Sequence, residues 1–273
     1  MKKEADDKKI IAVIQSRMGS KRLPRKALLW ILGKTLVEWA VYRLSFAQKI
    51  DGVILATADT PENDELAEFA AKIGLLCYRG SERDLISRLL GAAEKFGVDA
   101  IVRITGDCPL VDPAIVDKLV GVYRKSEGAL DFVTNAYPPT YPDGMDVEII
   151  SKQGLQKLDR DVKDSLHREW ITTTFMENPD KYKIQSVKND SDLSGLRLTV
   201  DYEEDFRLVE AIFKELHQEG KIFGLADILR LFERKPELLA LNKNRIDTTI
   251  VNNIRSGAFH ELKNNPVRDS GRK

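Results

Sequence analysis

Short apolar runs alternate with amphipathic stretches over the first 125 residues. The apolar runs are rich in β-branched residues and have the length of buried strands. They predict strands at residues 10–15, 52–57, 75–78 and 100–105. The stretches that follow them predict helices at residues 36–48, 61–73, 84–96 and 112–125. This alternation is typical of an α/β protein with three layers, in which helices cover both faces of a mainly parallel sheet.

The pattern becomes less regular beyond residue 130. Further strands are predicted at residues 131–135, 145–150, 183–188 and 196–200, and helices at 165–175, 203–218 and 225–232. No internal repeat or low-complexity linker divides the chain. We therefore predict one domain over residues 10–260, with an excursion at about 134–190. The polar ends, residues 1–9 and 261–273, are predicted to be flexible.

Charge composition narrows the classes of function. Lys+Arg and Asp+Glu each number 43 among 273 residues, so the formal net charge is zero. This balance gives no support for binding of nucleic acid or a membrane through bulk charge. The apolar run at residues 10–14 is also much shorter than a membrane helix. Cys77 and Cys108 have no CxxC spacing, so we expect reduced thiols in a cytoplasmic protein.

A basic loop directly after the first strand is the strongest chemical signal. Five of the ten positions from Arg17 to Lys26 are Lys or Arg, and Gly19 and Ser20 lie among them. Backbone N–H groups around the glycine can form an anion-binding nest, and Arg22 adds a forked cation. The spacing matches neither a Walker loop nor a dinucleotide-binding loop. Ligands of such sheets bind beyond the carboxyl ends of strands, which favours a triphosphate site over a solvated basic turn.

Two aspartates follow predicted strands. Asp107 comes after Thr105 and Gly106, and Asp201 comes directly after the strand predicted at 196–200. Each aspartate could equally cap a helix or stabilise a turn. Mg²⁺ favours one or two protein carboxylates together with substrate phosphate oxygens and water. If both strand ends lie beside the basic loop, the pair would form a magnesium site.

A third cluster lies in the excursion. Asp146 and Glu148 alternate along a predicted strand and would share one face. His167, Arg168 and Glu169 follow on a predicted helix. One interpretation is a pocket for an acceptor, in which Arg168 holds a carboxylate. The structural alternative is a Pro-Asp-Gly turn, an edge strand and a charged helix surface.

Six segments together resemble the cytidylyltransferases of the spore coat polysaccharide (SpsF) type, within the wider group of CMP-Kdo and CMP-sialic acid synthetases. They occur in the family's order over about residues 10–210. The segments are IIAVIQSRMGSKRLPRKALL, YRGSERDLISRLLGAA, IVRITGDCPLVDP, PPTYPDGMDVEI, LHREWIT and LRLTVDYEEDF.

This resemblance implies a fold like that of GT-A and nucleotide-diphospho-sugar transferases, with CTP as donor and Mg²⁺ as cofactor. It implies catalytic roles for Arg17, Lys26 and Asp107, and magnesium on Asp107 and Asp201. The residues expected at the nucleotide are Gly19, Ser20, Arg22, Arg79, Ser81, Asp84 and Thr105. The residues expected at the acceptor are Asp146, Glu148, His167, Arg168 and Glu169.

The function expected from this likeness is transfer of CMP to a small acidic acceptor, such as a 2-keto-3-deoxy sugar acid, with release of pyrophosphate. Such a reaction would serve surface polysaccharide or glycan biosynthesis. The resemblance also favours a homodimer. One alternative is a nucleotidyltransferase for a sugar phosphate, a polyol phosphate or a phosphonate. Others are a GT-A glycosyltransferase, whose diphosphate donor explains the basic loop less well, and a non-catalytic nucleotide sensor.

Overall fold

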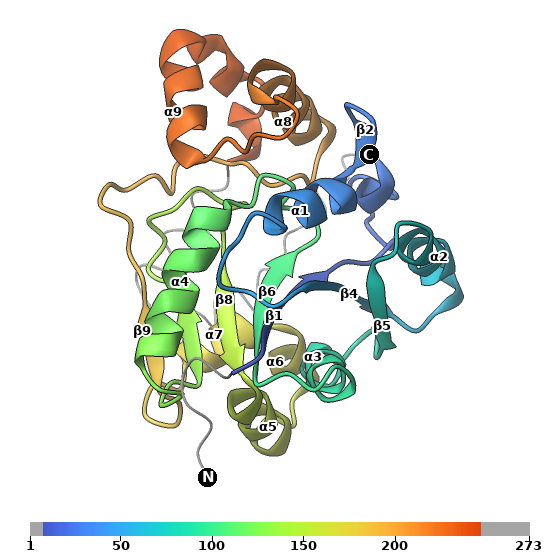
Figure 1. The fold of residues 1–273 in the computed structure, drawn as a ribbon, viewed down its shortest axis with the longest axis vertical. Coiled ribbons are helices and arrows are strands. Elements are labelled where there is room, and N and C mark those ends of the chain that lie inside the picture. The colour runs from blue at the N-terminus through green and yellow to red at the C-terminus, as the bar shows by residue number, and fades with distance from the viewer. Residues whose placement is uncertain (1–7, 247–273) are drawn as a thin grey trace, which may run out of the picture.

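A seven-stranded sheet runs through the centre of the computed structural model, which describes residues 8–246 (Figure 1). The strand order is β5-β4-β1-β6-β8-β7-β9, and only β8 among these seven runs antiparallel to its neighbours. The strands are β1 (Ile10–Gln15), β4 (Val53–Ala58), β5 (Leu76–Gly80), β6 (Ala100–Thr105), β7 (Phe132–Thr134), β8 (Glu148–Ser151) and β9 (Ile184–Ser186). The predicted mainly parallel sheet is confirmed.

Helices cover both faces of this sheet, as predicted. They are α1 (Leu36–Leu44), α2 (Asp64–Lys72), α3 (Leu85–Lys95), α4 (Pro113–Lys125), α5 (Lys152–Asp161), α6 (Ser165–Glu169), α7 (Ile171–Met176), α8 (Glu203–Leu216) and α9 (Leu225–Arg234). Short 3₁₀ turns occur at Lys26–Leu28, Pro61–Asn63, Pro236–Ala240 and Lys243–Arg245, and a small hairpin joins β2 (Trp30–Ile31) to β3 (Lys34–Thr35). No helix within residues 8–246 is both long and apolar enough to cross a bilayer.

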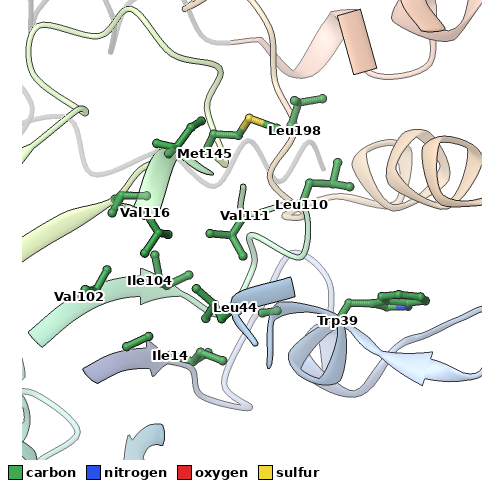
Figure 2. Packing of buried hydrophobic residues seen from close by; sticks show 14 of the residues in the cluster. Ile14, Trp39, Leu44, Val102, Ile104, Leu110, Val111, Val116, Met145 and Leu198 are labelled. Atoms are coloured by element: carbon green, nitrogen blue, oxygen red, sulfur yellow. The ribbon is translucent and has the colours of Figure 1, made fainter. Parts of the chain in front are cut away.

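The apolar run of β1 is explained by two separate cores. Ile10, Ala12 and Ile14 point into a cluster with α1, α4, α8 and α9, part of which Figure 2 shows. Ile11 and Val13 point the other way, into a cluster with α3, α5 and α7. A strand buried on both faces needs apolar residues at every position rather than at alternate ones.

Register brings the ends of β1 and β6 to the same edge. Gln15 pairs with Thr105, and the Gly106 N–H donates to the Gln15 carbonyl at 2.7 Å. A Cβ atom at Gly106 would lie 2.4 Å from the Ser16 side chain. Glycine therefore permits the close approach that places Asp107 beside the basic loop.

The prediction of a strand at residues 196–200 is wrong. This segment is an extended loop whose backbone forms one isolated parallel β-bridge, between Arg197 and Asp143. The Leu198 N–H donates to the Asp143 carbonyl at 2.7 Å, and Gly144, at φ 100°, lies directly beneath the same loop. The backbone partner of the segment is thus the Pro-Asp-Gly turn rather than another strand.

The single helix predicted at 165–175 is interrupted. Trp170, at φ −101° and ψ 65°, separates α6 from α7. The hydroxyls of Thr173 and Thr174 both donate to the Trp170 carbonyl, which is the kind of side-chain competition that weakens a helix. Helix α5 and the hairpin β2–β3 were not predicted. Of the ends predicted to be flexible, residues 1–7 of the first and all of 261–273 fall outside the described residues.

Candidate functional site

Lys26 lies at the centre of the candidate site. Its ammonium group is 2.7 Å from Asp107 Oδ2, 2.8 Å from Asp201 Oδ1 and 3.0 Å from the Val200 carbonyl. Burial alone would lower the pKa of Lys26, but the two carboxylates outweigh it and the pKa is raised. The structure therefore joins the basic loop to both aspartates that the sequence singled out.

Two loops distant in sequence hold these carboxylates together. Asp107 lies in the turn after β6, and Asp201 lies between the 196–200 loop and α8. The Val200 N–H donates to the Asp107 carbonyl at 2.8 Å, which fixes one loop against the other. The carboxylates thus owe their proximity to backbone contacts as well as to Lys26.

Asp201 is held by three cations. Besides Lys26, Arg22 approaches one carboxylate oxygen at 2.6 Å, and Arg197 binds the other at 2.9 Å. Burial alone would raise the pKa of Asp201, but Lys26 and Arg22 outweigh it and lower the pKa well below its usual range. Asp201 is therefore ionised at neutral pH.

Arg197 was not recognised in the sequence as a site residue. Its guanidinium pairs with Asp143 at 2.6 Å, with Asp201 at 2.9 Å and with Asp205 at 3.0 Å, and its side chain is only 12% exposed. The available signal was an arginine within an apolar run, four residues before a candidate ligand. Arg197 ties the Pro-Asp-Gly turn to the start of α8.

Two carboxyl groups in and just after the Pro-Asp-Gly turn, those of Asp143 and Asp146, have raised pKa values. Burial, opposed by Arg197, raises the pKa of Asp143 to about 6. Burial together with the nearby charges of Asp143 and Glu148 raises the pKa of Asp146 to about 8. Asp146 is therefore mostly protonated at pH 7, unlike Asp201.

A second polar group lies on the α3 and α7 side of the sheet. Arg103 donates from Nε to Gln15 at 2.8 Å, and its Nη1 binds Glu148. The Thr172 hydroxyl also donates to Glu148, which is only 3% exposed. Glu148, predicted at the acceptor, is thus a buried partner of Arg103, whose role the sequence did not reveal.

The basic loop is anchored on both sides. The Met18 N–H donates to Asn63 Oδ1 at 2.9 Å, and the Ser20 N–H donates to the Met18 carbonyl at 2.8 Å. Gly19 lies close to the Glu62 carboxylate, since a Cβ atom there would be 3.2 Å from it. Arg17 forms a 3.2 Å ion pair with Glu169. The loop therefore reaches the helix that carries the predicted acceptor residues.

The remaining residues predicted at the nucleotide lie near the ends of β5 and β6. Arg79 binds Asp59 at 3.1 Å and Asp64 at 2.6 Å. The Thr105 hydroxyl is 3.0 Å from Cys108 Sγ, which is a free thiol. Ser81 Oγ accepts from the Asp84 N–H at 3.1 Å, and Asp84 in turn caps α3. These contacts place the residues at the expected edge of the sheet, and their contact with a nucleotide stays a prediction.

Two residues predicted at the acceptor link helices in the structure. Arg168 donates from Nε to Asp84 at 2.7 Å and from Nη1 to the Val162 carbonyl at 2.8 Å, and it also binds Asp159. His167 Nδ1 is 2.7 Å from Asp164, the N-cap of α6, and its Nε2 is 3.2 Å from Glu177 at the end of α7. Arg168 therefore has most of its donors engaged, and its contact with an acceptor stays a prediction.

The donor set fits magnesium. Asp107 and Asp201 already share one cation, the Lys26 ammonium, so their oxygens are close enough to share a metal ion. Over residues 8–246, no three His, Cys, Asp or Glu side chains are grouped to hold a metal by themselves. Mg²⁺ typically completes such a two-carboxylate site with phosphate oxygens and water. The residues therefore suit magnesium that is bound together with a nucleoside triphosphate.

The sheet order, the basic loop after β1 and the paired carboxylates define an α/β protein of the nucleotide-diphospho-sugar transferase-like class. The profile of the cytidylyltransferase family matches residues 11–240. The chain therefore belongs to the cytidylyltransferase family. This finding confirms the resemblance seen in the sequence.

Solved structures agree with this assignment. A cytidylyltransferase from Leptospira borgpetersenii superposes with a TM-score of 0.80 at 34% identity, covering 85% of this chain and 97% of that one. The CMP:2-keto-3-deoxy-manno-octonic acid synthetase, solved with CTP, shares the fold, with a TM-score of 0.61 at 21% identity. The match covers 76% of this chain and 100% of the synthetase.

Curated relatives include proteins of bacteria and an archaeon. An uncharacterized protein of Methanocaldococcus jannaschii is 31% identical over 240 residues, which is 86% of this chain and 95% of the relative. The spore coat polysaccharide biosynthesis protein SpsF of Bacillus subtilis is 27% identical over 84% of this chain and 95% of its own length. A 3-deoxy-manno-octulosonate cytidylyltransferase of Chlamydia trachomatis is 34% identical over 50% of this chain and 54% of its own length.

Proposed function

We propose that this cytidylyltransferase transfers CMP from CTP to an acidic sugar of the 2-keto-3-deoxy class, with release of pyrophosphate and with Mg²⁺ as cofactor. The observation that carries the proposal is that Lys26, at the end of the basic loop, holds its ammonium group between Asp107 and Asp201. The choice of an acidic sugar is supported by the Chlamydia relative, which is named for 3-deoxy-manno-octulosonate.

The reaction we propose is an in-line displacement at the α-phosphorus of CTP. An acceptor oxygen forms a bond to that phosphorus while the bond to the bridging oxygen breaks, and pyrophosphate leaves with the electron pair. Arg17 and Arg22 lie on the basic loop, where they would stabilise the departing charge. Lys26 would exchange part of its contact with the carboxylates for a phosphate oxygen. Catalysis would then consist mainly of alignment and charge neutralisation.

Magnesium bound by Asp107 and Asp201 would supply additional positive charge at the triphosphate. The attacking hydroxyl must also lose a proton. Asp146 would accept it in its ionised form, since a pKa of about 8 still lies near the operating pH.

The wider setting follows from the same proposal. A role in surface polysaccharide or glycan biosynthesis is supported by the similarity to SpsF, which is named for spore coat polysaccharide biosynthesis. We place the reaction in the cytoplasm, where CTP is available, and we propose a homodimer because of the family resemblance.

Pyrophosphate release provides the test. Each nucleoside triphosphate is offered with Mg²⁺ to a panel of acidic sugars, sugar phosphates, polyol phosphates and phosphonates. Release that requires CTP and a keto-sugar acid, and that stops on addition of EDTA, supports the proposal. Release only with phosphorylated acceptors would move the function to the alternative acceptor class. An Asp107→Asn variant that retains full magnesium-dependent turnover would refute the metal assignment.

A further inference from the structure

Within residues 8–246, Arg88 is a buried cation that forms no ion pair with a carboxylate. It lies in the first turn of α3 and is 4% exposed. Its Nη1 donates to the Ser81 carbonyl, whereas its Nε is buried without any hydrogen-bond partner. Burial, assisted by the positive charge of Arg17, lowers the pKa of Arg88 to about 10, so the guanidinium is still charged at neutral pH. Burying a charge without a counter-ion is costly, which makes a purely structural role a poor explanation.

The acidic groups near Arg88 are already paired with other cations. Glu169 binds Arg17, and Asp84 binds Arg168. The Arg17–Glu169 pair is about half exposed, at 48% and 43% of the two side chains, so a competing anion can replace Glu169 at low cost. Arg88 therefore shares these carboxylates with other cations at the point where the basic loop meets the predicted acceptor helix.

We propose that Arg88 binds the carboxylate of the acidic acceptor. This inference rests on the proposed function and adds the group that recognises the acid. A guanidinium binds a carboxylate through paired, charge-assisted N–H donors, and Nη2 of Arg88 makes no hydrogen bond within residues 8–246. The bound carboxylate supplies the missing counter-ion.

The position of Arg88 favours the acceptor over the triphosphate. Its neighbours on α3, Leu85 and Leu89, belong to the core on the α3, α5 and α7 face. The loop that carries Asp201 instead packs through Leu198 and Val200 into the core on the opposite face. Lys26 and Arg22 thus lie with Asp201 on one side of the strand ends, whereas Arg88 lies on the side of Glu148 and Glu169.

The test compares Arg88→Met and Arg88→Lys with wild type, and uses Arg83→Gln as a matched control. Arg83 is an exposed arginine five residues away, just before α3. With the keto-sugar acid that wild type uses, we expect Arg88→Met to raise the acceptor KM by about 10- to 100-fold, the range of a lost charged hydrogen bond. The Kd for CTP is expected to change less than twofold. The amide of the same sugar acid should be used equally poorly by both proteins.

The Tm shows whether the fold is intact. We expect the Tm of Arg88→Met to equal or exceed that of wild type, since the variant removes an unpaired buried charge, and Arg88→Lys should recover part of the acceptor affinity. Unchanged acceptor KM in both variants would overturn the subsite while the proposed function stands. A loss of CTP affinity instead would assign Arg88 to the nucleotide. Failure of wild type to use any acidic sugar would refute the proposed function, and the subsite with it.

Discussion

Replacing Arg197 with glutamine is the most informative perturbation of the site. Arg197 contacts Asp143, Asp201 and Asp205 together, and it comes from a loop rather than from a helix or strand. Glutamine is two bonds shorter than arginine and keeps one amide group with two N–H donors, but it carries no charge. The substitution therefore asks how much of the fold depends on this cation.

The expected cost follows from the burial of the partners. The Asp205 side chain is fully buried and that of Asp201 is 16% exposed, so both would lose a counter-ion in a poorly solvated place. Breaking such a buried pair typically costs about 3–5 kcal/mol. Asp205 would keep the N–H groups of Asp201 and Tyr202 and the amide of Asn242, which places the loss near the lower end. Since about 1 kcal/mol lowers Tm by roughly 2–4 °C in a protein of this size, we expect a decrease of at least about 6 °C.

Urea unfolding and calorimetry at pH 7 give the free energy and the Tm. Arg207→Gln serves as the control, because its pair with Glu203 on α8 is more than 60% exposed at both ends and should contribute at most about 1 kcal/mol. The difference between Arg197→Gln and wild type should narrow as the pH falls below about 4. The lowered pKa of Asp201 stabilises the folded state only where that carboxylate is ionised. If Arg197→Gln lowers the free energy of unfolding no more than Arg207→Gln does, the reasoning is refuted.

Three further substitutions test other parts of the site. Lys26→Met should reduce pyrophosphate release about 100-fold or more, as loss of a preorganised charge does, and single-turnover rates within threefold of wild type would contradict this. Gly106→Ala should destabilise the protein by about 1–3 kcal/mol in urea unfolding, because its Cβ atom would lie 2.4 Å from Ser16. In the control Gly195→Ala, the added Cβ meets nothing within 4 Å, and the stability should not change. Equal stabilities of the two variants would contradict the steric argument. Because the pKa of Asp146 is raised to about 8, wild-type stability should fall as pH rises from about 4 to 8. The Asp146→Asn variant should show a smaller decrease over this range. Parallel pH profiles of stability for the two proteins would exclude the raised pKa.

Periodicity predicted most of the first half of the fold. The bounds of β1 and β6 agree with the predicted strands residue for residue, because a strand buried on both faces carries apolar residues at most positions rather than at alternate ones. The loop at 196–200 shows the limit of this inference. Its apolar residues are buried, but its backbone pairs with a turn at residue 143, and hydrophobicity does not report the identity of a hydrogen-bond partner.

The sequence by itself determined the basic loop, the candidate aspartates and the family resemblance. Each depends on residues that are neighbours in the chain, where spacing and turn chemistry carry the information. Only the tertiary structure decided that Lys26 meets Asp201, which lies 175 residues away. The same holds for Arg197, which contacts three carboxylates, and for Arg88, which forms no ion pair within residues 8–246. The pairing of a buried charge depends on every segment that packs around it, and those segments come together only when the chain folds.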